Sequence, residues 1–559
     1  MFDADAESAW LEAIQEIVDG DFGRHDVRTE AMRLLEHPAG AVAAISLIVD
    51  ASAAASEGMR TLAELIDDEK ELEDPRVEAA AQLLEEFLKQ TRHVSRMGHS
   101  GGAAVRKAIE RTIDDFQPLD VAARMRLAGI YVGAGLPVPE SLILPPEMIG
   151  TLVPGSPGEE GPPADALAAV LAELDEAAEI EPFDAYVELR RNMAAAPDAI
   201  IALLAQAAGT AASPAVARFA AYFLLERNPE IRRAAAGGLR ARADGPGLEP
   251  ALAAALTRMR PWINDEAVLA DLASALRVGR IRADGPQAAP PARITRALAC
   301  LPEPSGARQL IYAVRQDGER LLLFVVVDDE EGVIGTMVMS VADAVEERAI
   351  REDLKETLGA VEVPAAFLET EIGMAIAKAM PERPDLLDIA ELVGARFEPV
   401  STSTEEILAP ILASKAARGR PIPPRAWERA AARAPVPEWT DGGDAIPEAA
   451  LLDDPVEVLA REVEHRLESR RAIWARRLAA TAATLAASEA HARDAAAWMP
   501  FALDARALLE GKPLDEIPLM RHVTAVTLAG QLVLMTSTGL EDFDPDGLDL
   551  DDLDDLDDD

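Results

Sequence analysis

The chain has 559 residues, of which 49% are hydrophobic and only 4% aromatic, enough apolar material for about three or four domains or one long repeat array. Its formal net charge of −45 repels phosphate backbones, so general nucleic-acid binding is not expected. A single cysteine, Cys300, excludes internal disulfides and multi-cysteine metal sites, and no apolar run approaches the roughly 18 residues that span a bilayer.

Residues 1–143 are predicted to form an N-terminal helical domain, because apolar residues recur there at three- and four-residue spacing. The acidic N-terminus, MFDADAES, lacks the basic and apolar regions of a Sec-type signal, so a cytoplasmic location is expected. Asp74-Pro75 supplies an N-cap and a proline at the first helical position, and another helix is predicted over 103–116. Residues 144–163 are rich in proline and glycine and are predicted to be a linker.

Residues 164–284 are predicted to be helical and contain a faint internal repeat. Segments starting at Ser213, Asn228 and Asn264 each begin with a cap residue and place Ala and Leu on one face, and the last two starts are 36 residues apart. The sequence NPEIRRAAAGGL from Asn228 resembles the second-helix signature of HEAT-type repeats, and DPRVEAAA at 74–81 is similar. This resemblance implies stacked helix pairs with an extended protein-binding surface, and no particular chemistry. The alternative is an ordinary alanine-rich bundle with the same caps.

Residues 285–400 are predicted to form a small central α+β module that begins with a proline-rich linker. Three apolar runs are separated by Asp317-Gly318, a dipeptide typical of tight hairpins, and by a polar turn ending at Gly332. These runs predict an antiparallel three-stranded meander with strands near 309–314, 321–327 and 333–339. Because the middle run is entirely apolar, both of its faces should be buried, with helices over 341–358 and 364–380 as the covers.

The remaining chain is predicted to be helical after a loose segment. Residues 401–449 are rich in proline and glycine, with one helix near 405–417. Residues 450–538 form a C-terminal helical domain, in which arginines and glutamates alternate along 456–490 and indicate salt-bridged exposed faces. Residues 539–559 form an acidic disordered tail. The predicted fold class is mainly α, with HEAT-like or bundle arrays and one α+β module.

One motif suggests catalysis. Gly98-His99-Ser100-Gly101-Gly102 fits G-x-S-x-G, in which a sharp strand-to-helix turn exposes a nucleophilic serine in α/β-hydrolases. The stretch before it, QTRHVSRM, is polar and does not read as a strand. A glycine-rich loop between two helices is therefore favoured over a serine hydrolase built on Ser100.

The acidic tail offers a partial calcium loop. Asp542, Asp544 and Asp546 have the spacing of the first EF-hand ligands, but Leu553 stands where a bidentate glutamate is needed. A defined metal site is therefore not predicted. A tail that promotes solubility is favoured over an acidic, leucine-containing segment that folds on a basic partner.

The other chemistry-bearing residues form no recognisable first shell. The seven histidines make no pair spaced for a metal, and no phosphate-binding or dinucleotide-binding glycine motif is present, so no metal and no cofactor are predicted. The predicted function is a non-enzymatic interaction scaffold or regulatory adaptor in the bacterial cytoplasm, with a protein partner of basic character and no nucleic-acid or membrane partner. The alternatives are the Ser100 hydrolase and an acidic chaperone or nucleic-acid mimic that acts through the tail. The oligomeric state stays open.

Overall fold

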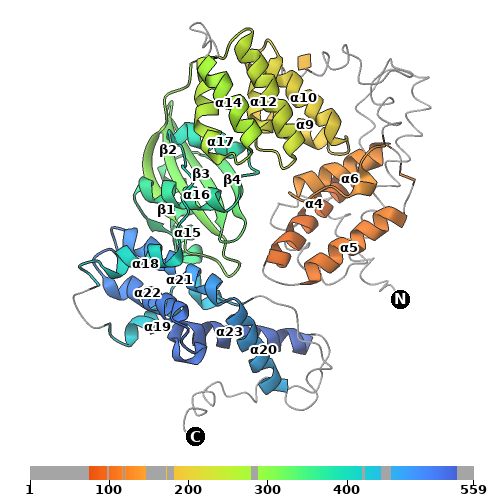
Figure 1. Ribbon diagram of the computed structural model, residues 1–559. Helices are drawn as coiled ribbons and strands as arrows, with labels where there is room; N and C mark the ends of the chain where they lie inside the picture. Colours follow the sequence, from red (N-terminus) through yellow and green to blue (C-terminus); the bar gives the residue numbers. More distant parts are fainter. Residues whose placement is uncertain are drawn as a thin grey trace. The chain divides into compact units, whose positions relative to one another are not determined.

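A computed structural model describes residues 75–96, 100–115, 118–119, 121–145, 171–172, 175, 182–278, 287–417, 422–441 and 455–537 (Figure 1). The chain divides into two compact units. The first unit comprises Met1–Leu298, Gln309–Glu347 and Pro364–Ser401, and the second comprises Ala299–Arg308, Arg348–Val363 and Thr402–Asp559. The described residues are mainly helical and contain one five-stranded sheet, which confirms the predicted class of a mainly α chain with a small α+β module.

Three helices open the described part of the first unit: α4 (Pro75–Arg96), α5 (Ser100–Asp115) and α6 (Val121–Gly133). α4 begins at the proline after Asp74, as the cap pattern predicts, and α5 begins three residues before the predicted 103. Their shared core includes Phe87, Ile109 and Leu127, each no more than 1% exposed. The rest of the predicted N-terminal domain, residues 1–74, and residues 146–163 of the predicted linker lie outside the described residues.

Six helices follow in two rows. They are α9 (Pro182–Asn192), α10 (Asp198–Thr210), α11 (Pro214–Phe223), α12 (Pro229–Asp244), α13 (Pro250–Met259) and α14 (Glu266–Val278). α10, α12 and α14 pack side by side, while α9, α11 and α13 form the neighbouring row (Figure 1). Ser213 and Asn228 are N-caps as predicted, whereas the third cap is Asp265 and not Asn264.

α10 and α12 approach each other at two glycines. A Cβ added to Gly238 would lie 2.4 Å from the backbone oxygen of Gln206, and one added to Gly209 would lie 2.8 Å from the carbonyl carbon of Gly238. The two helices therefore meet backbone to backbone, and neither position leaves room for a larger residue.

The sheet has strands β1 (Arg293–Ala299), β2 (Arg308–Gln316), β3 (Glu319–Asp328), β4 (Gly332–Val341) and β5 (Val361–Glu362), in the order β4-β3-β2-β1-β5. The three predicted strands correspond to β2, β3 and β4. The predicted meander was incomplete, because β1 and the two-residue β5 extend it on one side. Asp317 and Gly318 both have positive φ, as the hairpin turn between β2 and β3 requires.

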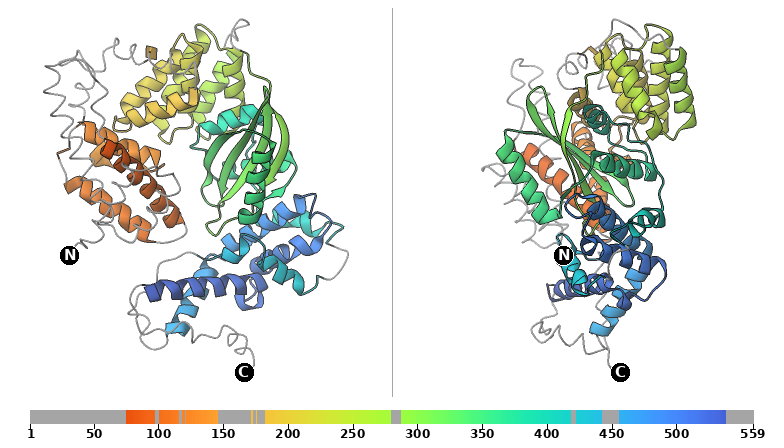
Figure 2. Two further views of the ribbon diagram at one scale, coloured as in Figure 1. Left: turned by 180° about the vertical axis from the view of Figure 1, so that it is seen from behind. Right: turned by 90° about the vertical axis from the view of Figure 1, so that its left-hand side faces the viewer.

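β3 is buried on both faces, as its all-apolar run predicts. The successive residues Leu322, Leu323, Phe324 and Val325 are all at most 6% exposed, although their side chains alternate between faces. The predicted helices are present as α15 (Ala344–Leu358) and α16 (Ala365–Lys378), and α16 packs on β3 and β4 (Figure 2). α17 (Asp385–Val393) also contacts β4.

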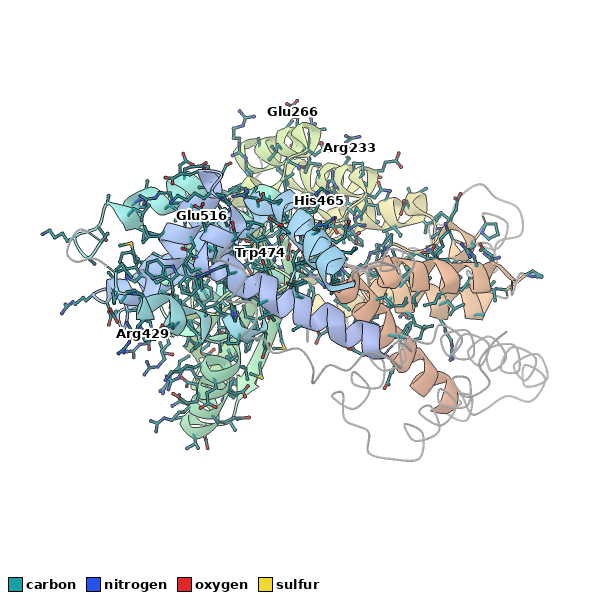
Figure 3. All side chains as sticks on the ribbon, turned by 90° about the horizontal axis from the view of Figure 1, so that it is seen from below. Arg233, Glu266, Arg429, His465, Trp474 and Glu516 are labelled. Carbon is teal, nitrogen blue, oxygen red and sulfur yellow. The ribbon has the colours of Figure 1, made fainter. Side chains whose placement is uncertain are left out.

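The second unit is built from α18 (Thr404–Leu412), α19 (Arg425–Ala431), α20 (Pro455–Ser469), α21 (Arg471–Ala487), α22 (Ala495–Leu509) and α23 (Pro518–Ser537). Trp439, Trp474 and Trp498 are buried among them, and Figure 3 shows Trp474 inside the unit. Two expectations need correction. The predicted helix near 405–417 is present as α18, but the rest of segment 401–449 is not merely loose, since it also holds α19 and the buried Trp439. Arg477 is not on an exposed face, since it is 1% exposed and donates hydrogen bonds to the carbonyl oxygens of Pro304 and Ser305, each at 2.8 Å.

Within the described ranges, every helix is either too short or too polar to cross a lipid bilayer.

Candidate functional site

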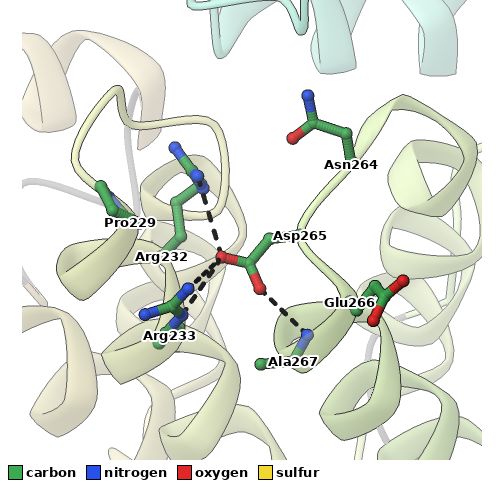
Figure 4. A pocket seen from close by; sticks show the side chains of 7 residues that line it. All are labelled: Pro229, Arg232, Arg233, Asn264, Asp265, Glu266 and Ala267. Carbon is green, nitrogen blue, oxygen red and sulfur yellow. Dashed lines mark hydrogen bonds and ion pairs between the residues drawn. The ribbon is translucent and has the colours of Figure 1, made fainter.

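The best-defined surface feature of the first unit lies where α12 and α14 begin (Figure 4). Asp265 Oδ1 accepts hydrogen bonds from the backbone N–H groups of Ala267 at 3.0 Å and Val268 at 3.3 Å, so it caps α14. Its other oxygen, Oδ2, accepts from Arg233 Nε at 3.2 Å and lies 3.1 Å from Arg233 Nη2. This one carboxylate therefore caps the N-terminus of α14 and links that helix to α12.

The contacts of Asp265 stabilise its ionised form. Burial opposes ionisation, because its side chain is only 8% exposed, but the amides of Val268 and Ala267 and the guanidinium of Arg233 outweigh this and lower its pKa below the ordinary value. The carboxylate is therefore ionised at neutral pH and attracts both Arg233 and, at 3.9 Å, Arg232 Nη2.

A shallow depression of about 610 Å³ surrounds this pair, lined by Pro229, Arg232, Arg233, Asn264, Asp265, Glu266 and Ala267 (Figure 4). Two arginines beside two helix N-termini would suit an anion. Asp265 already occupies that position, and Arg232 Nη1 donates to the carbonyl oxygens of Glu226 at 2.8 Å and Arg227 at 2.7 Å. We therefore interpret the depression as a structural joint between helices and not as a ligand site.

Similar polar contacts link the other helices of this row. Asn228 Oδ1 accepts from the N–H of Glu230 at 2.8 Å, which caps α12, while Asn228 Nδ2 donates to Asp198 Oδ2 in the first turn of α10 at 2.6 Å. Arg240 on α12 donates to Asp271 on α14 at 2.9 Å. The caps Asn228 and Asp265 thus connect α10, α12 and α14 near their N-terminal ends, and the Arg240–Asp271 pair connects α12 and α14 farther along.

A buried ion pair links α12 to the N-cap residue of α13. Arg242 and Glu249 have side chains that are 0% and 2% exposed, with Nη2 and Oε1 2.5 Å apart. Arg242 also donates to the carbonyl oxygen of Ala211, which fixes the loop between α10 and α11. Removing either partner would leave an uncompensated buried charge.

A second polar cluster joins α11 to α17. Arg218 donates to both oxygens of Glu391, at 3.0 and 2.9 Å, and to Asp388 Oδ1 at 2.7 Å. The Tyr222 hydroxyl lies 3.0 Å from the same Asp388 oxygen, and burial raises the pKa values of both Tyr222 and Asp388. Tyr222 is therefore a neutral donor at physiological pH, and the cluster attaches the α+β module to the array without offering an activated nucleophile.

The second unit contains a buried aspartate at its centre. Asp441 Oδ1 accepts from Arg470 Nη1 at 2.6 Å and from Trp474 Nε1 at 3.2 Å, while its backbone N–H donates to Thr527 Oγ1 at 2.9 Å. Burial raises the pKa of Asp441, against the influence of Arg470. These contacts join three separate parts of the second unit and leave Asp441 only 1% exposed.

Asp504 is a second buried carboxylate in this unit. It accepts from Trp427 Nε1 at 3.0 Å and from the N–H of Leu519, in the first turn of α23, at 2.9 Å. Burial outweighs these bonds and raises its pKa to about 6. Asp504 therefore changes its protonation state closer to neutral pH than an ordinary aspartate does.

Of the predicted site residues, only Ser100 lies in the part of the chain that the structure describes. Ser100 is the first residue of α5, and the described element before it is the helix α4, which ends at Arg96, whereas a nucleophile elbow follows a strand; residues 97–99 lie outside the described residues. Asp542, Asp544 and Asp546 lie outside the described residues. Within the described ranges, no three His, Cys, Asp or Glu side chains are grouped to hold a metal ion.

The clusters that do form were not anticipated. The cap role of Asp265 had a local signal in the sequence, since Asp265 follows Asn264 at a predicted helix start. Arg218 and Asp388 had none, because 170 residues separate them.

Comparison with known proteins matches two of these regions. Residues 197–282, which hold α10 to α14, match the family described as the Y4lR second domain. Residues 427–531 match the Y4lR C-terminal helical domain. The uncharacterized protein y4lR of Sinorhizobium fredii (strain NBRC 101917 / NGR234) is 26% identical over 441 residues, covering 76% of this chain and 82% of that protein. No solved structure matches.

Proposed function

We propose that the chain is a non-enzymatic scaffold or adaptor that binds another protein through a HEAT-like helical array formed by α9 to α14. One observation carries the proposal: α10, α12 and α14 form one row and α9, α11 and α13 the other. Helices stacked in this way create an extended surface on the outside of each row, which repeat proteins use for binding.

The contacts between helices support a repeat architecture over an ordinary bundle. The caps Asn228 and Asp265 each contact the neighbouring helix of the same row, so adjacent helices are joined by an equivalent contact at an equivalent place. The backbone approach at Gly209 and Gly238 adds a close contact between α10 and α12. A bundle around a single core needs no such recurrence.

The outward side of the row is accessible and chemically mixed. Leu203 on α10 is 43% exposed, and Arg233 and Arg240 on α12 have side chains that are 56% and 52% exposed. Exposed apolar and arginine side chains are favourable in protein interfaces. The chain's net charge of −45 favours a partner of basic character over nucleic acid, and we place the complex in the bacterial cytoplasm, away from membranes.

Site-specific photo-crosslinking in the source cell tests this proposal. A photoreactive amino acid would replace Leu203 or Gln206, which are exposed on α10, and Glu510 of the second unit would serve as the exposed control. We expect one discrete protein adduct from the α10 positions and none from the control. Equal labelling at all three positions, or no adduct at any, would contradict a binding surface on the array.

Two further arms address the other functions considered. Labelling by a fluorophosphonate probe that is lost in Ser100→Ala would establish a serine hydrolase and overturn the scaffold proposal; we expect no labelling. Deletion of residues 541–559 should leave the adduct in place. If the deletion abolishes it, the acidic tail and not the array binds the partner.

A further inference from the structure

β4 is an edge strand of unusual character. It lies at the end of the sheet order, and within the described residues its outer side pairs with no other strand (Figure 1). The strand is ten residues long, reads GVIGTMVMSV, and contains no charged residue and no proline. Edge strands are usually protected from pairing by lysine, proline or a bulge, because their free N–H and C=O groups would otherwise bind a further strand.

The protection of β4 is confined to its first half. The β3–β4 register shifts between Val326 and Val327, so Ile334 is the additional residue of a bulge, and Arg383 Nε donates to its carbonyl oxygen at 3.2 Å. From Thr336 to Ser340 the pairing with β3 is regular. This part of β4 therefore has a regular register, contains no charged residue, and pairs on its outer side with no strand of the described residues.

Side chains in the second half of β4 are much more exposed than their partners on β3. Met337 and Val338 are 50% and 47% exposed, and they point to opposite faces of the sheet. Their partners on β3, Phe324 and Leu323, are 6% and 0% exposed. An added strand beside β4 would continue the apolar layer on both faces, as a partner strand does in β-augmentation.

The charges beside this edge are mainly acidic, with Arg383 at Ile334 as the basic exception, and they indicate the kind of strand that fits. Asp343 and Glu346, just beyond the end of β4, are exposed, and hydrogen bonds from the backbone N–H groups of Glu346 and Val345 hold the pKa of Asp343 below its ordinary value. Glu330 is exposed before the start of the strand. A second copy of the chain would bring the same acids and a net charge of −45 against this edge, whereas a strand with basic flanks would complement it.

We propose that residues 336–340 of β4 are a docking site for an extended segment of a partner protein, in which alternating apolar residues are flanked by arginine or lysine. The segment adds a sixth strand antiparallel or parallel to β4, and its apolar side chains cover Met337 and Val338. This site involves different residues from the helical array and does not rest on it.

A synthetic peptide tests the proposal with the full chain. The probe is a capped, fluorescein-labelled peptide with alternating threonine and valine between pairs of arginines, and binding is followed by fluorescence anisotropy. We expect saturable binding and protection of the 336–340 amides from hydrogen–deuterium exchange. A peptide with glutamate flanks, and one with arginine flanks and a central proline, should each bind at least about tenfold more weakly.

Two lysine variants separate strand pairing from general charge attraction. Val338→Lys places the charge on the proposed edge, and Val345→Lys places it on α15, at a side chain that is 76% exposed. We expect about a tenfold loss of affinity for Val338→Lys and less than about a twofold change for Val345→Lys. Should Val338→Lys fail to fold, the proline peptide decides the question with the unmodified chain.

Three results would overturn the proposal. Equal affinity of the two lysine variants would show that β4 is not involved. Equal affinity of the proline-containing peptide would show attraction by charge without strand pairing. A dimer of the unmodified chain in sedimentation, lost in Val338→Lys, would show that a second copy and not a basic segment occupies the edge.

Discussion

Asp265 serves two helices at once, because one of its oxygens caps α14 and the other contacts Arg233 on α12. Asp265→Ala removes both, and we expect it to lower the free energy of unfolding of the first unit by about 1–2 kcal/mol in urea titrations. Glu266→Ala is the matched control, since Glu266 is the exposed neighbour in the first turn and should matter by less than about 0.5 kcal/mol. Similar values for the two variants would show that neither the cap of α14 nor the contact with α12 contributes to stability.

Asp504 makes the stability of the second unit depend on pH. Its pKa is raised from 3.8 to about 6 in the folded state, so the folded state binds the proton more tightly than the unfolded state. The stabilisation from this proton is therefore complete below about pH 4 and is lost as the pH rises through about 6.

Asp504→Asn removes this dependence, since an amide does not titrate. We expect the free energy of unfolding of the original chain, relative to the variant, to fall between about pH 4 and pH 6 and to be constant above that range. Chemical unfolding monitored by tryptophan fluorescence across this range measures it, with Asp515→Asn, an exposed acid of the same unit, as control. A constant difference at every pH would contradict the assigned pKa.

The pairing of α10 with α12 depends on a glycine that cannot be replaced. A methyl group at Gly238 would lie 2.4 Å from the Gln206 backbone oxygen, whereas one at Gly237 meets nothing within 4 Å. Gly238→Ala should therefore destabilise the chain by about 1–3 kcal/mol, because the helices must separate.

Gly237→Ala is the same chemical change one residue away, and it should stabilise the chain by about 0.4–1 kcal/mol by lowering the entropy of the unfolded state. Thermal unfolding of the two variants side by side gives the comparison. If Gly238→Ala is as stable as Gly237→Ala, the close approach of the two helices is not real.

The sequence predicted these elements unevenly, for physical reasons. β2, β3 and β4 were predictable because their apolar runs and the Asp317-Gly318 turn are local signals. β1 was missed because its first residues are polar and exposed, and β5 because two residues carry no periodicity. Arg477 looked like a surface residue of a charged helix, but it is buried against the carbonyls of Pro304 and Ser305, a contact across more than 170 residues.

In the candidate sites too, roles that depend on neighbouring residues could be predicted from the sequence, whereas contacts between distant residues could not. The cap role of Asn228 followed from its position before Pro229, and its contact with Asp198 did not. The cluster of Arg218, Tyr222 and Asp388 forms only once α17 packs against α11, so no local pattern indicates it. The Ser100 motif is the reverse case, in which the local letters fit a catalytic pattern and the preceding helix does not.

The described residues of the first unit include a two-row helical array and a sheet module whose helix α17 is joined to the array by the partly buried ion pairs of Arg218. The second unit is helical and contains the buried Trp439, Trp474 and Trp498. The charged and polar side chains of the best-defined clusters are matched by partners in the same unit. This arrangement is consistent with the proposed role, in which surfaces of the array bind another protein.

The central claim is that the outward side of α10, α12 and α14 binds a protein. Hydrogen–deuterium exchange of the full chain, with and without the protein recovered by photo-crosslinking, tests it most directly. We predict slower exchange along the exposed residues of these three helices and unchanged exchange in α19 to α23. Protection confined to the second unit, or no protection anywhere, would contradict the account.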